Sequence, residues 1–175
     1  AGWGSCARAF DIRPVDFADV SGCATLSEAV EGAPAIVSVV TAEAAVEVAQ
    51  QVAPYLERGA FYFDCNSVSP DSKRAAASVI EAAGGHYIDT AVMAPVNPQL
   101  MAVPLLLSGV QAEAGSVILA NLGFANIRVV GHDVGRAATI KMLRSVMYKG
   151  VEALTAECLL ACERAGVTDE VLASF

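Results

Sequence analysis

The sequence predicts an α/β fold, in which a Rossmann-like, mostly parallel sheet lacks its first βα unit and is followed by the start of an all-helical domain. One observation behind this prediction is that short apolar segments alternate with helical segments as far as residue 131. The other is that residues 137–165 show one long helical pattern without any strand pattern. We therefore expect a Rossmann-like domain at residues 1–132 and the beginning of a helical domain at 133–175.

The first elements are a strand, a short helix and a second strand. Residues 7–12 predict a short strand that ends at Asp11, and the apolar run at 33–41 predicts a nearly continuous buried strand. Between them, Thr25 or Ser27 can cap a short helix. The Gly-x-Gly at residues 2–4 follows no strand and lacks a third glycine at the spacing of a dinucleotide-binding turn, so we expect that strand and turn to lie outside this chain.

The alternation of strands and helices then repeats, with glycines closing the helices. The predicted segments are strands at 61–65, from 87, at 104–108 and at 127–130, and helices at 42–58, 70–83 and 111–122. Strands that alternate with helices of this length predict a parallel sheet with helices on both faces.

The long helix predicted at 137–165 has an apolar and a polar side. The apolar side is formed by Ile140, Leu143, Met147, Val151 and Leu154. The polar side carries Lys141, Arg144, Ser145, Tyr148, Lys149 and Glu152. We expect the apolar side to pack on a helical domain that continues past residue 175.

The composition excludes several classes of function. Hydrophobic residues make up 55% of the chain and charged residues 17%, so most surface must be buried either inside this fold or across a subunit interface, and we expect a homodimer or higher homo-oligomer. A net charge of -8 argues against nucleic acid as a partner. The most apolar stretch, residues 35–53, is interrupted by Glu43 and Glu47, which argues against a membrane span. Without a signal-peptide pattern at residue 1, we expect a cytoplasmic protein.

The five cysteines predict no disulfide framework and no metal site. Their number is odd and none forms a Cys-x-x-Cys pair, so free thiols in a reducing compartment are expected. Cys158 and Cys162 lie one helical turn apart, but no histidine or further cysteine stands at ligand spacing.

Polar residues follow the predicted strands, at the edge where a doubly wound sheet binds ligands. Asp11, at the end of an early strand, can accept hydrogen bonds from an adenosine ribose, or it can be an ordinary solvated aspartate. Asn66 and Ser67 stand between a strand and a helix that starts at a proline, where free backbone N–H groups favour an anion. Ordinary capping by Ser67 or Ser69 explains the same residues.

Lys141 is the candidate catalytic residue, because a lysine at this point of a mostly apolar helix can point into a cleft. A solvated or salt-bridged lysine has the same spacing. The spacing alone leaves both interpretations open.

Taken in order, three motifs resemble those of the β-hydroxyacid dehydrogenase superfamily, which includes 3-hydroxyisobutyrate, tartronate semialdehyde and 6-phosphogluconate dehydrogenases. Residues 64–70 resemble the family's D-x-S-T-x-S-P cofactor segment, residues 87–96 its f-x-D-A-P-V-S-G-G substrate segment, and residues 135–145 its G-x-G-x-x-x-K-x-x-N catalytic helix. The similarity covers nearly the whole chain and implies a protein that continues beyond both ends. Residues 141–154 look like the helical domain of a branch described as putative phosphogluconate dehydrogenase-like.

The resemblance implies a role for each candidate residue. It implies an NAD or NADP cofactor contacted by Asp11, Thr41 and Ser67. Arg13 and Asn66 are further candidate cofactor residues by their positions, and Asn66 can instead orient the substrate together with Ser145. It places Met93, Ala94 and Pro95 at the substrate-binding turn, Lys141 as the catalytic lysine and Ser145 beside the substrate. It also implies a helical domain that serves in substrate binding or dimerisation.

Two departures from the family pattern concern the substrate. The S-G-G turn is replaced by residues 93–95, where Met93 and Pro95 remove hydroxyl and N–H donors for a small carboxylate, and the asparagine one turn after the lysine is replaced by Ser145. The substrate is therefore expected to differ from that of the standard members. The K-x-x-H-N pattern of true 6-phosphogluconate dehydrogenases is missing as well.

The expected reaction is hydride transfer between nicotinamide and a β-hydroxyacid-type substrate, with Lys141 as general acid and base. Desolvation and the nearby Arg144 or Lys149 would lower the lysine pKa from its ordinary value of about 10.4. Asp11 suits the free ribose of NAD, whereas Arg13 suits the phosphate of NADP, so both cofactors remain open. The alternatives are a non-catalytic dinucleotide-binding or dimerisation module and an imine-reducing enzyme, of which Lys141 counts against the second.

Overall fold

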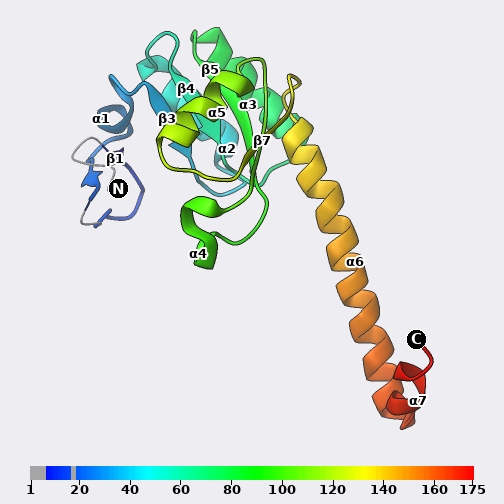
Figure 1. The fold of residues 1–175 in the computed structure, drawn as a ribbon. Coiled ribbons are helices and arrows are strands. Elements are labelled where there is room, and N and C mark those ends of the chain that lie inside the picture. The colour runs from blue at the N-terminus through cyan, green and yellow to red at the C-terminus, as the bar shows by residue number, and fades with distance from the viewer. Residues whose placement is uncertain (1–6, 17–18) are drawn as a thin grey trace. The chain divides into compact units, whose positions relative to one another are not determined.

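The computed structural model describes residues 7–16 and 19–175 (Figure 1). The Gly-x-Gly at residues 2–4 and Cys6 lie outside the described residues. The chain divides into two compact units, one up to Thr139 and one from Ile140 to Phe175.

The centre of the first unit is a five-stranded sheet of β3 (Ala35–Ser38), β4 (Phe61–Asp64), β5 (His86–Val92), β6 (Leu105–Ser108) and β7 (Ile127–Gly131), in that order. All neighbours are parallel except β5 and β6, so the predicted mostly parallel sheet is confirmed. The antiparallel pair was not predicted. The chain between these two strands forms only the short helices α4 (Val96–Gln99) and η3 (Leu100–Ala102), rather than the crossover helix that parallel strands need.

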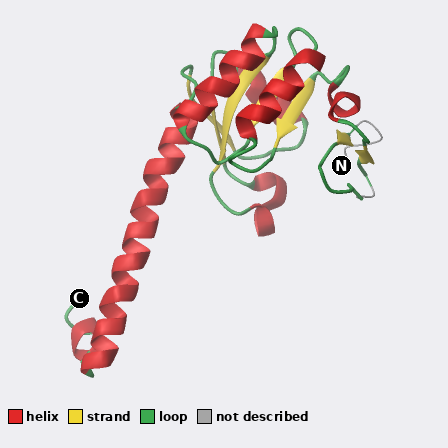
Figure 2. Cartoon of the chain, turned by 180° about the vertical axis from the view of Figure 1, so that it is seen from behind, coloured by secondary structure: helices red, strands yellow, loops and turns green. Residues whose placement is uncertain are grey.

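Helices cover both faces of this sheet, as predicted (Figure 2). On one face α2 (Ala45–Val52) and α3 (Pro70–Ala82) pack on Tyr62 and Tyr87, and on the other α5 (Ala112–Asn121) packs on Phe63 and Ile88. Neighbouring residues of one strand belong to opposite cores because side chains alternate along a strand. The two buried cores hold the sheet between its helices.

Pro54 explains why α2 is shorter than the helix predicted at 42–58. The helix ends at Val52 and the chain continues as the 3-10 helix η2 (Ala53–Tyr55), with the proline near its start. Proline has no N–H to continue the ladder of α-helical hydrogen bonds.

The chain before the large sheet forms a small parallel pair of strands and a capped helix. The predicted strand at 7–12 is shorter, β1 (Arg8–Ala9), and it pairs with β2 (Ser21–Gly22), which was not predicted. Helix α1 (Leu26–Val30) is capped by Thr25 in a reciprocal box with Glu28. Of the two predicted capping residues, Thr25 is therefore the one used.

The second unit is helical. It contains the part of α6 (Arg136–Ala165) from Ile140 onward and α7 (Thr168–Leu172). Leu143, Met147 and Leu154, on the predicted apolar side of α6, are 66%, 68% and 69% exposed. Their packing on further helices stays a prediction. Among the residues that the structure describes, no helix has both the length and the apolar character of a membrane span.

Candidate active site

Three buried polar side chains form a row across three adjacent parallel strands, at the carboxyl ends of β3 and β4 and three residues before the end of β5. The register pairs Ser38 of β3 with Asp64 of β4, and Asp64 with Asp89 of β5. All three are buried, and the two aspartates are fully so. The carboxyl ends of parallel strands are where open α/β sheets bind ligands, so this row is the base of the candidate site.

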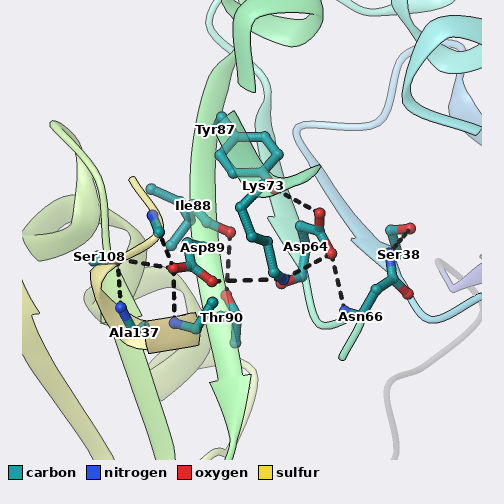
Figure 3. Close-up of polar contacts among 12 residues, drawn as sticks. Ser38, Asp64, Asn66, Lys73, Tyr87, Ile88, Asp89, Thr90, Ser108 and Ala137 are labelled. Carbon is teal, nitrogen blue, oxygen red and sulfur yellow. Dashed lines mark hydrogen bonds and ion pairs between the residues drawn. The ribbon is translucent and has the colours of Figure 1, made fainter. Parts of the chain in front are cut away.

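Lys73 of α3 reaches this row from one face of the sheet. Its Nζ donates to the backbone oxygen of Asp64 at 2.7 Å and to Asp64 Oδ1 at 2.9 Å, and lies 3.5 Å from Asp89 Oδ1 (Figure 3). The lysine side chain is 1% exposed. A buried ammonium is tolerated only with such partners, and here one ammonium stands between two carboxylates.

Two stacked tyrosines lie beneath the row. Tyr87 Oη donates a hydrogen bond to Asp64 Oδ2, and the rings of Tyr62 and Tyr87 are 5.9 Å apart and inclined by 19°. Burial raises the pKa of Tyr62 to about 12. Burial, followed by the neighbouring Asp64 carboxylate, raises the pKa of Tyr87 far above its usual range. Both phenols therefore stay protonated at neutral pH, and Tyr87 acts as a donor to Asp64.

Asn66 ties together the loops that follow β3 and β4. Its Oδ1 accepts from the backbone N–H of Val40 at 2.6 Å, and its Nδ2 donates to Ser38 Oγ at 3.1 Å. Its own backbone N–H donates to Asp64 Oδ1 at 2.9 Å. Asn66 is 4% exposed, whereas Thr41 and Ser67, on the two loops that it joins, are exposed. The structure thus brings together three of the five predicted cofactor residues, with Asn66 as the buried one.

The helix after this turn has its own cap. Ser69 Oγ accepts from the backbone N–H of Ser72 at 3.1 Å, and Pro70 begins α3. Of the two serines considered for capping, Ser69 is the one that caps, so Ser67 is not used as the N-cap.

Asp89 and Ser108 hold the beginning of α6. Asp89 Oδ2 accepts from Ser108 Oγ at 3.1 Å and from the backbone N–H groups of Gly135 and Ala138 at 3.1 and 3.0 Å. Ser108 Oγ accepts from the backbone N–H of Ala137 at 3.0 Å (Figure 3). These groups hold the first turn of α6, at residues 135–138, beside Asp89 and Ser108.

The remaining predicted site residues lie on three other segments. Asp11 follows β1 and is exposed; its Oδ1 accepts from the backbone N–H of Arg13 at 2.8 Å and lies 3.6 Å from the Arg13 Nε. Met93, Ala94 and Pro95 follow the end of β5, where the Met93 N–H donates to the Pro104 carbonyl at 2.9 Å. Lys141 and Ser145 lie about one turn apart in α6, within the second unit.

The role of Lys73 was not predicted, although the sequence carried a signal for it. Lys73 stands with Ala76, Ala77 and Ile80 at the spacing of one helix face, and all four are buried. A lysine on the apolar face of a helix requires a buried anion as its partner. That signal points to Asp64 and Asp89, the acidic residues of the two adjacent strands.

Comparison with known proteins identifies relatives over most of the chain. Residues 10–114 match the NAD binding domain of 6-phosphogluconate dehydrogenase, which supports the predicted NAD or NADP cofactor. The chain is 31% identical over 137 residues to an uncharacterized 28.5 kDa protein from the 7S RNA 5′ region of Methanothermus fervidus, a match that covers 78% of this chain and 51% of that protein. The chain thus spans about half the length of this relative.

Solved structures agree with the fold. A conserved hypothetical protein from Sinorhizobium meliloti 1021 is 38% identical, with a TM-score of 0.80, over 96% of this chain and 60% of that one. Two more distant structures share the fold alone. They are a Mycobacterium tuberculosis 3-hydroxyisobutyrate dehydrogenase with L-serine (18% identical, TM-score 0.73, 85% of this chain and 52% of that one) and a Myxococcus stipitatus imine reductase with NADP+ (24%, 0.73, 90% and 56%).

Proposed function

Because the chain belongs to the family of the NAD binding domain of 6-phosphogluconate dehydrogenase, we propose that its full-length protein is an NAD(P)-dependent oxidoreductase. The proposed reaction transfers a hydride between nicotinamide and a β-hydroxyacid-type substrate. The observation that carries this proposal is the row of strand ends, where Asn66 joins the Thr41 and Ser67 loops and Asp89 anchors the start of α6. The loops proposed for the cofactor and the helix proposed for catalysis therefore begin at one edge of the sheet.

The residues at this edge fit a dinucleotide. Thr41 and Ser67 offer exposed hydroxyl groups on adjacent loops, and α3 begins beside them with Pro70 in its first turn. Backbone N–H groups at a helix start favour an anion such as a phosphate. Asp11 would accept from the adenosine ribose, and Arg13 would contact the extra phosphate if the cofactor is NADP. The bound nicotinamide would supply the hydride chemistry.

Lys141 is the proposed general acid and base. Oxidation of a hydroxyl group to a carbonyl releases a proton from oxygen, and reduction requires one, so a lysine amine beside that oxygen can move it in both directions. Ser145, about one turn further along α6, is the proposed partner for the substrate hydroxyl or carboxylate. Both assignments rest on the resemblance of residues 135–145 to the catalytic helix of the family.

Residues 93–95 are the proposed substrate turn. Pro95 has no N–H to donate and Met93 has no hydroxyl, and the Met93 N–H already donates to Pro104. A turn with few donors favours a substrate whose bulk contacts an apolar side chain. We therefore propose a β-hydroxyacid that is bulkier or less polar than serine.

The test uses the natural full-length protein. Calorimetry with NAD+ and NADP+ measures cofactor binding, and absorbance at the wavelength of the reduced cofactor follows oxidation of 3-hydroxyisobutyrate, L-serine and a β-hydroxyacid with a longer apolar side chain. We expect one dinucleotide to bind and the longer acid to be oxidised fastest. Binding without turnover of any of the three acids would favour the alternative, a non-catalytic dinucleotide-binding or dimerisation module.

A further inference from the structure

Helix α6 begins without an N-cap side chain of its own. Gly135 precedes its first residue and has no side chain to accept a hydrogen bond, and its φ is +94°. The first backbone N–H groups of a helix have no partner within the helix and need one elsewhere. Here the N–H of Arg136 donates to the Asp133 carbonyl, while those of Ala137 and Ala138 are taken by side chains of the sheet.

Those side chains come from two strands far away in the sequence. Asp89 of β5 accepts from Ala138, 49 positions later, and Ser108 of β6 accepts from Ala137, 29 positions later. The same Ser108 hydroxyl donates to Asp89 Oδ2, so the two caps are also joined to each other. A carboxylate at the positive end of a helix is electrostatically favourable.

Lys73 fixes the Asp89 side chain from the other side. One oxygen of the carboxylate faces the helix, and the other lies 3.5 Å from Lys73 Nζ. Lys73 is in turn held by two bonds to Asp64. Asp89 Oδ2 accepts three hydrogen bonds, Oδ1 has the ion pair with Lys73, and the side chain is fully buried, so these contacts together hold the carboxylate toward α6.

We propose that Asp89, held by Lys73, is a positioning residue that sets the first turn of α6 and thereby places Lys141 for proton transfer. This inference rests on the role of Lys141 in the proposed function. Lys141 follows Ala138 by three residues in the same helix, which is less than one turn. If the first turn unwinds, the backbone that carries the lysine amine loses its fixed position, and turnover falls although the amine itself is unchanged.

An ordinary local cap would begin the helix at much lower cost. In most helices a serine or aspartate at the N-cap accepts from the first N–H groups without burying a charge, whereas this helix start uses two buried carboxylates and a buried ammonium. Buried ion pairs add little net stability compared with apolar residues of similar size. The buried cluster of Asp64, Lys73 and Asp89 therefore adds little stability for its cost, but it fixes the position of the first turn of α6, as positioning of a catalytic group requires.

The decisive variant is Ser108→Ala in the full-length protein, with Ser116→Ala as its matched control. Ser108→Ala removes one hydroxyl that caps Ala137 and contacts Asp89, and leaves every charge in place. Ser116→Ala removes a hydroxyl of α5 that donates to the Glu113 carbonyl and lies outside this network. Hydrogen exchange of the backbone at residues 135–138 measures the first turn, and kcat, KM and cofactor affinity measure its effect.

We expect Ser108→Ala to speed exchange at Ala137 by about tenfold, the equivalent of one ordinary hydrogen bond, and to lower kcat by a similar factor. Cofactor affinity and KM should change less than kcat, and Ser116→Ala should change neither exchange nor kcat. Asp89→Asn keeps an oxygen that can cap Gly135 and Ala138, so it should retain more kcat than Asp89→Ala. A higher kcat in Asp89→Asn than in Asp89→Ala would support the role of Asp89 in positioning α6.

Three results would overturn the inference. Unchanged exchange in Ser108→Ala would show that the sheet does not set the helix start. Faster exchange with unchanged kcat would show a purely structural role, provided that Lys141→Ala abolishes turnover in the same assay. Normal turnover of Lys141→Ala would instead refute the proposed function, and the inference with it, whatever the exchange data show.

Discussion

Ala138 donates its backbone N–H to Asp89 Oδ2 at 3.0 Å, across 49 positions of sequence. This bond connects the start of α6, the proposed catalytic helix, with Asp89, whose contact to that helix is visible only in the structure. Residues 135–145 resemble a catalytic helix, but the chain around Gly135 does not say what holds the start of that helix. Asp89, on the middle strand β5, holds it by accepting from the backbone N–H groups of Gly135 and Ala138.

Loss of the buried ammonium should destabilise the protein strongly. Lys73→Met leaves Asp64 and Asp89 as two neighbouring buried carboxylates without their shared cation, and removal of one partner of a buried ion pair costs about 3–5 kcal/mol. Denaturant unfolding measures the free energy of unfolding. Lys149→Met, at an exposed position of α6, is the control and should cost less than about 0.5 kcal/mol. Equal effects of the two variants would contradict the role of Lys73.

Alkaline pH should weaken the fold through Tyr62. Its pKa is raised from 10 in the unfolded chain to about 12 in the folded one, because burial disfavours the phenolate. The folded state therefore holds its proton more tightly, so this stabilisation is complete below pH 10 and is lost as the pH rises from 10 to about 12. Denaturant unfolding at a series of pH values measures the loss, which is on the order of 2–3 kcal/mol for this group.

Tyr62→Phe is the control for this pH dependence. Phenylalanine keeps the ring that stacks on Tyr87 and removes the titrating hydroxyl. The variant should lose less free energy of unfolding between pH 10 and 12 than the natural protein does. The same slope in both proteins would assign the alkaline transition to other groups.

Turnover should depend on Lys141 and not on Lys149. Lys141→Ala in the full-length protein removes the proposed proton donor and acceptor, which typically lowers turnover by about 10² to 10⁴, while cofactor affinity is kept. Lys141→Arg should not restore it, because a guanidinium does not release its proton near neutral pH. Steady-state kinetics and cofactor titration measure both properties. A larger loss of turnover in Lys149→Ala would instead assign the proton transfer to Lys149, about two turns further along α6.

Gly135 should tolerate no side chain. A Cβ there would lie 2.8 Å from Arg74 Nη1 and 3.0 Å from Pro70 Cβ, and φ is +94°. Gly59 has a similar φ of +82° but nothing within 4 Å of an added Cβ, so Gly59→Ala measures the backbone strain alone, about 1–2 kcal/mol. We expect Gly135→Ala to cost at least about 1 kcal/mol more in denaturant unfolding, because the contacts add to the strain. Equal costs would mean that Arg74 and Pro70 move aside freely.

Local patterns in the sequence predicted most of the elements. Thr25 with Glu28 signals a helix start within four residues, and Pro70 with Ser69 does the same for α3, so these helices were placed correctly. The alternation of Tyr62 with Phe63 between two cores is likewise a local pattern. Where a few neighbouring residues decide the structure, the sequence suffices.

Partners far apart in the chain explain what was missed. The pairing of β2 with β1 depends on two residues in each strand, too few for a recognisable period. The direction of β6 depends on how the chain between Met93 and Pro104 folds back, and short apolar strands look alike in both directions. Lys73 meets Asp89 only once α3 lies on the sheet. Such contacts are determined by tertiary packing, which no local pattern records.

The capping of α6 also bears on how the chain folds during synthesis. Every group seen to accept from its first backbone N–H groups, in Asp89, Ser108 and Asp133, leaves the ribosome before the helix does. A nascent chain that has emerged as far as residue 138 thus already carries the complete template for the helix start. Because its first turn is already hydrogen-bonded, the helix can then grow one residue at a time and does not depend on the part of the chain that is synthesised later.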